Sequence, residues 1–248
     1  EHSYYFKEGY YIYLFNGRKS AMPVTEYLIR NAELYPDEVA LVELNPDEKD
    51  TRRTTWKEFD LIQPSANMPY RREITWSVFN EKANRFANML ISRGVKKGDK
   101  VAILMYNCLE WLPIYFGVLK TGAIAVPFNF RYDSDEIYYC AELAQVDVIV
   151  FGFAFIGRIE VNAERLLRGR LLIYVGDNCP SFAESYHELV ADCSSKEPDV
   201  KITEDDYGAI YFSSGTTGFP KAILHKHQSL TQAAIMEQKH HSTGRDDT

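Results

Sequence analysis

Residues 211–221 read YFSSGTTGFPK, and this stretch decides how the rest of the chain is interpreted. Its two glycines let the backbone approach a ligand without a Cβ in the way, and its hydroxyls and successive N–H groups can donate to anionic oxygens. Lys221 adds a cation, and each charge-assisted hydrogen bond to a phosphate oxygen is worth about 1.5–3 kcal/mol. The stretch therefore predicts a phosphate-binding loop. Its predicted ligands are Ser213, Ser214, Gly215, Thr216, Thr217, Gly218 and Lys221.

The sequence around this loop differs from a Walker A element, which has four residues between its first glycine and its Gly-Lys pair. Pro220 removes an N–H donor and favours extended geometry for Phe219, so the loop is not expected to run directly into a helix. Residues 207–212 and 222–224 are short apolar runs typical of buried strands. We therefore place the loop between two strands. A solvated Ser/Thr/Gly turn is the simpler alternative.

Composition narrows the class of protein. The 248 residues are 46% hydrophobic and 25% charged, which is typical of a soluble globular chain with one large or two small domains. The net charge of −7 and the lack of a basic cluster argue against a nucleic-acid partner. The most apolar stretch, residues 146–157, is too short to span a membrane. Attachment to a membrane surface and homo-oligomer formation are left open.

The four cysteines are widely spaced, at positions 108, 140, 179 and 193, and no secretory leader precedes them. This spacing favours neither a zinc site nor a disulfide framework, and we predict no metal site made by protein side chains. The pattern predicts a reducing, cytoplasmic compartment.

Strands and helices alternate from residue 76 onward. A helix is predicted at 76–93, with Gly94 as its C-terminal cap. Strands then follow at 101–105, 124–126, 146–151 and 171–175, with helices at 109–119, 135–144 and 182–190. Asn107 with Glu110, and Ser181 with Glu184, read as capping pairs at two of these helix starts. The alternation predicts an α/β fold with a doubly wound, largely parallel sheet and helices on both faces.

The chain is predicted to have three segments. Residues 1–73 hold an aromatic N-terminal cover, a helix opened by Pro23, a strand at 39–44 and a polar insertion at 45–72. For the aromatic cover, an edge hairpin that packs on the domain is favoured over a partner-binding patch. Residues 74–212 form the parallel α/β core, and residues 213–248 hold the loop, a strand and a following helix.

The run SSGTTGFPK at 213–221 resembles the signature of the adenylate-forming, AMP-binding superfamily of acyl-CoA synthetases, amino-acid adenylation domains and luciferases. The resemblance covers most of the chain from about Ile74 onward. Residues 128–132, with Asn129, are closer to acid-CoA ligases than to adenylation domains of peptide synthetases, which usually carry aspartate there. For Asn129, a turn role and a direct contact with substrate are equal alternatives. The chain departs from the family's pattern at Ala222, where a glycine is common, and in its length, which is well short of the family's.

The resemblance implies an ATP-dependent acid-CoA ligase with Lys221 as its catalytic residue. A carboxylate, fatty or related, would attack the α-phosphate of ATP to give an acyl-adenylate, and the thiol of CoA would then displace AMP. ATP, Mg²⁺ and CoA are the implied cofactors and substrates. An adenylation domain that loads a carrier protein, or a non-catalytic scaffold with the same fold, are the alternatives. The chain is interpreted as an N-terminal fragment that is inactive by itself, because half a site cannot position substrates.

His225 and His227 follow the loop, and they would share one strand face if the strand continued that far. Relatives often carry a histidine at the position of His227, so it is a candidate neighbour of the site. A structural role is favoured, since an isolated histidine is usually packed or solvated. The adjacent pair at 240–241 does not make a metal site without further ligands.

Overall fold

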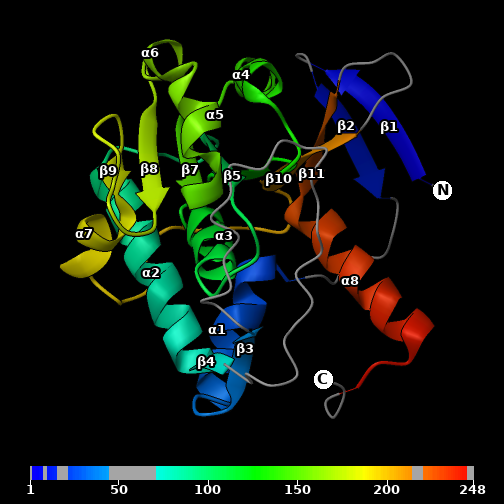
Figure 1. The fold of residues 1–248 in the computed structure, drawn as a ribbon. Coiled ribbons are helices and arrows are strands. Elements are labelled where there is room, and N and C mark those ends of the chain that lie inside the picture. The colour runs from blue at the N-terminus through cyan, green and yellow to red at the C-terminus, as the bar shows by residue number, and fades with distance from the viewer. Residues whose placement is uncertain (1, 8–9, 16–21, 45–70, 214–219, 245–248) are drawn as a thin grey trace.

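The computed structural model describes residues 2–7, 10–15, 22–44, 71–213 and 220–244. Residues 214–219 of the predicted loop and residues 45–70 of the predicted insertion lie outside these ranges. The fold is α/β, with a mostly parallel sheet in the order β1-β2-β11-β10-β6-β5-β7-β8-β9 (Figure 1). The predicted fold class is therefore confirmed.

The main sheet and its helices follow in chain order. The strands are β1 (His2–Lys7), β2 (Tyr10–Phe15), β5 (Lys100–Leu104), β6 (Ile124–Pro127), β7 (Val148–Gly152), β8 (Leu171–Val175), β9 (Glu184–Ser185), β10 (Tyr207–Ser213) and β11 (Lys221–Lys226). The α-helices are α1 (Val24–Leu34), α2 (Trp76–Ser92), α3 (Trp111–Lys120), α4 (Ser134–Leu143), α5 (Ile156–Glu160), α6 (Ala163–Leu166), α7 (Tyr186–Ala191) and α8 (His227–His241). A 3₁₀ turn, Phe153–Phe155, precedes α5.

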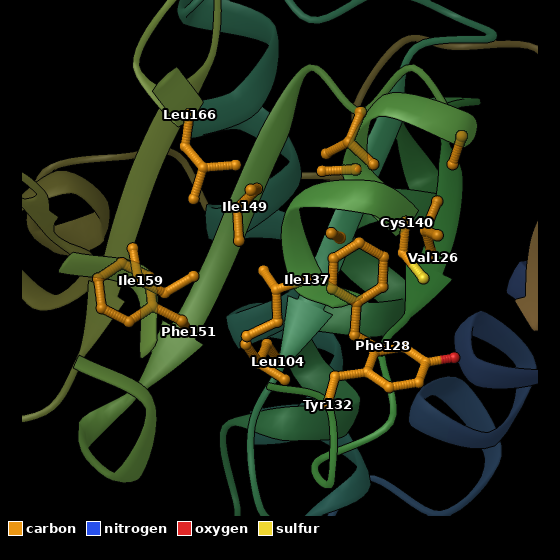
Figure 2. Packing of buried hydrophobic residues seen from close by; sticks show 14 of the residues in the cluster. Leu104, Val126, Phe128, Tyr132, Ile137, Cys140, Ile149, Phe151, Ile159 and Leu166 are labelled. Atoms are coloured by element: carbon orange, nitrogen blue, oxygen red, sulfur yellow. The ribbon is translucent and has the colours of Figure 1, made fainter. Parts of the chain in front are cut away.

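The parallel strands β6, β5, β7 and β8 form the core, and apolar clusters cover both of their faces. One cluster packs α4, α5 and α6 against the sheet, and the other packs α2, α3 and α7 against the opposite face. Figure 2 shows side chains of the first cluster, among them Leu104, Ile137 and Phe151, between α4 and the sheet. Burying each such side chain contributes about 1.5–3 kcal/mol, so the continuous apolar runs form buried strands.

Local signals place some helix ends as predicted. α2 starts where the side chain of Thr75 accepts a hydrogen bond from Val78 N, and it is followed by Gly94 at φ +86°, a left-handed conformation that favours glycine. α4 starts with a capping box between Asp133 and Glu136.

The two predicted capping pairs are wrong. Trp111 N donates to Cys108 O, so a tight turn precedes α3, and Glu110 makes no side-chain cap. α7 starts after Ser185, whose hydroxyl accepts from Glu188 N, and not at residue 182. Two Ser-x-x-Glu patterns follow one another here, and the later one is used because Glu184–Ser185 pairs with β8 as β9.

The antiparallel hairpin β1–β2 lies at one edge of the sheet and β9 at the other (Figure 1). β2 runs parallel to β11, so the predicted edge hairpin is confirmed. A separate two-stranded sheet pairs β3 (Val39–Leu44) with β4 (Arg71–Thr75). This pairing crosses the predicted boundary at residue 73, and the division into three segments stays a prediction.

Polar side chains of α2 hold the segment at 193–197, which leads toward β10. The side-chain amide of Asn84 donates to Ser195 O at 2.9 Å, and that of Asn88 donates to Ser194 O at 2.8 Å. Lys120 from α3 is almost fully buried and donates to Glu197 at 2.5 Å. Burial lowers the pKa of Lys120, while Glu197 opposes this shift. The connection to β10 is therefore tied to two helices.

Candidate phosphate site

The two ends of the predicted phosphate loop face each other across an antiparallel ladder. Ser213 is the last residue of β10 and Lys221 is the first of β11, and they are register partners. The prediction that the loop joins two strands is confirmed. Ser214, Gly215, Thr216, Thr217 and Gly218 lie outside the described residues, so their contacts with phosphate stay predictions.

The hairpin β10–β11 has one buried face and one partly exposed face. Ile210, Ala222 and Leu224 are buried in the core cluster, so Ala222 uses its methyl group for packing. Directly opposed residues of an antiparallel pair share a face. Ser213 and Lys221 therefore lie on the other face, where both are partly exposed.

Aromatic side chains hold the carboxyl end of β10 from its buried side. The ring of Phe212 lies 5.8 Å from that of Phe128 and 6.4 Å from that of Tyr132, both edge to face. Arg158 Nη1 donates to Tyr132 O at 3.0 Å and also to the carbonyl of residue 130, which anchors the loop after β6. Asn129 Oδ1 accepts from the backbone N of the residue two positions on, which supports its turn role.

A pair of tyrosine hydroxyls holds β10 from the other face. Tyr211 Oη lies 2.9 Å from Tyr115 Oη on α3, and the ring of His225 packs against Tyr211 with centroids 5.2 Å apart. Burial raises the pKa of Tyr115 and that of Tyr211, so both hydroxyls stay protonated at neutral pH. No local pattern in the sequence predicts this pair, because 96 residues separate its members.

The amino end of β10 is anchored through Asp206. Its carboxylate accepts from Lys97 Nζ at 2.6 Å and from Thr203 N at 2.7 Å, and its carbonyl accepts from His227 N at 2.9 Å. Partial burial would raise the pKa of Asp206, but hydrogen bonds from Lys97 and Thr203 and the charge of Lys97 lower it overall. Asp206 thus joins β10 and α8 to the turn before β5, a contact with no signal in the local sequence.

His227 lies at the opposite end of β11 from Lys221. Six residues of extended strand separate them by about 20 Å. His227 begins α8, so it does not share a strand face with His225 as predicted. It is fully buried, and among the described residues neither of its ring nitrogens has a hydrogen-bond partner. Burial lowers its pKa to about 4, with a smaller opposing effect from Asp206, so the ring is neutral.

The backbone around His227 is shaped to receive its ring. A β-bulge falls at Gly208 of β10, and a Cβ there would lie 3.3 Å from the imidazole, tighter than ordinary van der Waals contact. This close packing supports the structural role for His227 and not a direct role at the loop.

Within the described ranges, no three His, Cys, Asp or Glu side chains come together as metal ligands. None of the helices in the described part of the chain has both the length and the hydropathy needed to cross a membrane.

The profile described as AMP-binding enzyme matches residues 28–248. The chain belongs to this family. Its loop motif, its largely parallel sheet and the placement of Ser213 and Lys221 are therefore features of an AMP-binding chain.

The curated relatives are named as CoA ligases. The long-chain-fatty-acid–CoA ligase FadD13 of Mycobacterium tuberculosis is 32% identical over 174 residues, which is 70% of this chain and 33% of FadD13. The 3-hydroxybenzoate–CoA/4-hydroxybenzoate–CoA ligase of Thauera aromatica is 30% identical over 182 residues, 73% of this chain and 35% of that protein. The chain spans about a third of the length of these relatives.

Solved structures share the fold. A long-chain-fatty-acid-CoA ligase (FadD1) from Archaeoglobus fulgidus superimposes with a TM-score of 0.74 at 18% identity, over 99% of this chain and 44% of that one. The anthranilate CoA ligase AuaEII gives a TM-score of 0.69 at 24% identity, over 84% and 35% of the two chains.

Proposed function

We propose that this chain is the N-terminal part of an AMP-forming, ATP-dependent acid-CoA ligase. The observation that carries the proposal is the cross-strand pair Ser213–Lys221, called the rung below. It closes a Ser/Thr/Gly-rich loop at the carboxyl end of β10 in an AMP-binding fold. Ligands of open α/β sheets bind outside the carboxyl ends of the strands. The rung lies at that end.

In the proposed reaction a carboxylate oxygen attacks the α-phosphorus of ATP and pyrophosphate leaves. The acyl-adenylate then reacts with the thiol of CoA, which forms the thioester and releases AMP. The protein contributes alignment and charge neutralisation more than covalent chemistry. Lys221 neutralises charge on the β- and γ-phosphates, Ser213 donates its hydroxyl to a phosphate oxygen, and residues 214–218 add backbone and hydroxyl donors.

Mg²⁺ belongs to this proposal as the partner of ATP. The described residues hold no carboxylate cluster that would bind it. The acid is proposed to be fatty or related, because FadD13 is named for long-chain fatty acids. The hydroxybenzoate ligase shows that relatives of similar identity are named for other acids.

The cytoplasm is the proposed compartment, supported by free thiols at Cys108, Cys140, Cys179 and Cys193. Homo-oligomer formation and surface attachment to a membrane stay open predictions.

The experiment measures ATP–pyrophosphate exchange with fatty and hydroxybenzoic acids, followed by acyl transfer to CoA or to a carrier protein. The enzyme is this chain joined to the remaining two thirds that its relatives have. Lys221→Ala is expected to lower kcat/KM for ATP about 10- to 100-fold, the loss of one charge-assisted phosphate contact. Lys226→Ala is the matched control, because Lys226 lies at the far end of β11 and pairs with Asp205 at 3.1 Å.

Each rival function has its own outcome. Transfer to a carrier protein but not to CoA would support an adenylation domain, and the absence of exchange with every acid would support a scaffold. Equal rates in the Lys221→Ala enzyme would overturn the phosphate assignment. Robust exchange from the 248-residue chain alone would contradict its place as one part of a larger catalytic unit.

A further inference from the structure

The carboxyl half of β10 has few register pairs with the parallel core, although the strand packs beside β6. In the ladders of the described strands, β10 pairs with β6 only at Ala209 and Ala125. By contrast β5 and β6 share four register pairs, and β7 and β8 share five. Beyond Ala209, the register pairs of β10 are with β11 and not with β6. Side-chain contacts therefore help to set where Ser213 lies relative to the core.

Besides Ile210, which is buried in the core cluster, Phe212 and Tyr211 make such contacts from opposite faces of β10. Phe212 packs against Phe128 and Tyr132 by apolar ring contacts, which tolerate small shifts. Tyr211 instead makes a directional hydrogen bond, 2.9 Å long, with the hydroxyl of Tyr115. Hydrogen bonds weaken steeply with distance and misalignment, so this contact defines position more sharply than ring packing does.

The side chain of Tyr115 is held in place by its neighbours. Its side chain is buried, and its ring stacks on Trp111 with centroids 5.4 Å apart and meets Phe116 edge to face at 6.0 Å. α3 itself lies in the core cluster that covers the sheet. A buried hydroxyl without a partner is costly, so the Tyr115 hydroxyl favours the arrangement in which Tyr211 reaches it.

The position of Tyr211 affects the position of the proposed phosphate ligands, because they lie on the same hairpin. Tyr211 and Ser213 are two residues apart and therefore share one face of β10. Their ladder partners are Ile223 and Lys221, respectively, so the Tyr211 rung lies about 7 Å from the rung that holds Ser213 and Lys221. A shift of Tyr211 would move that rung with it.

We propose that Tyr115 is a positioning residue for the Ser213–Lys221 pair and acts through the hydroxyl of Tyr211. What the pair binds rests on the proposed function, whereas the position of the pair does not. Tyr115 contacts neither substrate nor reacting atoms in this proposal. It sets where the cation of Lys221 stands relative to the parallel core.

The first test needs no activity and uses the 248-residue chain. Lys221 and Lys226 are labelled with an amine-reactive acetylating reagent, and mass spectrometry gives the ratio of their rates. Tyr115→Phe and Tyr211→Phe are each expected to raise the Lys221/Lys226 ratio at least about 2-fold, and the double variant should match the single ones because one hydrogen bond is lost in every case. A ratio equal to that of the wild type in both single variants overturns the proposal.

The matched control is Tyr174→Phe. The hydroxyl of Tyr174 on β8 donates to Asp177 O at 2.9 Å, so this variant also removes a tyrosine hydrogen bond, but on the far side of the sheet. The ratio should stay at the wild-type value. If Tyr174→Phe raises it as much as Tyr115→Phe does, the effect is general loosening and the positioning role is wrong. Should Tyr115→Phe fail to fold, Tyr211→Phe carries the test, because Tyr211 is 37% exposed.

The second test uses the enzyme that contains the whole catalytic unit. Tyr115→Phe should raise KM for MgATP about 3- to 10-fold with a smaller change in kcat, whereas Tyr174→Phe should change neither. An unchanged KM together with an unchanged labelling ratio refutes the positioning role even if Lys221→Ala abolishes exchange. If instead Lys221→Ala has no effect on exchange while the labelling ratio responds, the proposed function fails and the positioning role stands.

Discussion

The parallel core and the β10–β11 hairpin are built differently, although they belong to one sheet. Residues 101–104 of β5 are all buried, and β5 has four register pairs with each neighbouring strand. The hairpin has one buried face, a bulge at Gly208 and one recorded pair with β6. It is also held by the pairing of β11 with β2 and by individual contacts, above all those of Tyr211, Phe212 and Asp206.

The parallel core therefore supplies most of the stability, and the hairpin places the proposed phosphate ligands. The free energy gained by apolar burial in the core is roughly proportional to the area removed from water, and it is non-directional. A phosphate ligand must be placed within hydrogen-bonding distance, so the hairpin relies on directional contacts such as that between Tyr115 and Tyr211. Substitutions in the two regions should therefore differ most in their effect on the free energy of unfolding.

The largest effect is expected from Phe151→Ala in β7. Phe151 is fully buried between Tyr174 and Phe182, and its loss removes apolar burial and leaves a cavity. Urea denaturation should show a loss of about 3–5 kcal/mol. Phe212→Ala in the hairpin, where the ring is only partly buried, should cost about half as much. Equal losses would mean that the hairpin is as much a part of the stable core as β7.

Acid should lower the free energy of unfolding through His227, at the end of the hairpin remote from the loop. Its pKa is about 4 in the folded chain and about 6.5 when unfolded, so the unfolded state binds the proton first. This contribution to stability is complete above pH 6.5 and is lost as the pH falls toward 4, by about 3 kcal/mol in all. Asp206 and Lys97 are the charged groups that act on the ring.

Urea denaturation from pH 7 to pH 4 measures this loss, with His227→Phe as the comparison. The variant keeps an aromatic ring but cannot titrate, and the carboxylates contribute equally to both proteins. The difference in unfolding free energy between the two should therefore change by about 3 kcal/mol over this range. A constant difference would contradict the depressed pKa of His227.

Glu197→Ala should give an intermediate loss of about 2 kcal/mol. Among the described residues, the variant leaves the buried ammonium of Lys120 with one side-chain acceptor, Asn80 Oδ1 at 2.8 Å. Glu197 itself is 41% exposed, so the loss stays below that of a fully buried pair. Asp205→Ala is the control, since Asp205 is 75% exposed and its pair with Lys226 should contribute less than about 1 kcal/mol. Thermal unfolding of both variants decides whether the 193–197 segment is an integral part of the fold.

The smallest effect on stability is expected from Lys221→Ala, below about 0.5 kcal/mol, as for most substitutions outside the core. The same should hold for Lys226→Ala, so the two lysines differ in function and not in stability. Differential scanning calorimetry measures both. A loss above about 2 kcal/mol for Lys221 alone would make it a structural residue and would weaken its proposed role at the phosphates.

Much of the core could be predicted from local pattern. The apolar runs of β5, β6, β7 and β8 and the periodicity of α2 report burial directly, so their positions were predicted to within a few residues. The start of α7 was missed because Ser181 and Ser185 both begin a Ser-x-x-Glu pattern. Only pairing with β8 shows that residues 184–185 are extended.

The amino-acid order alone was enough for the α/β class and for a Ser/Thr/Gly-rich loop closed by Lys221 between two strands, because these depend on residues close together in the chain. The tertiary structure decided that β10 lies beside β6, that Tyr211 meets Tyr115 and that His227 is buried at the end of β11 remote from the loop. These contacts join residues that are tens of positions apart. They depend on strand order in the sheet, which no local propensity encodes.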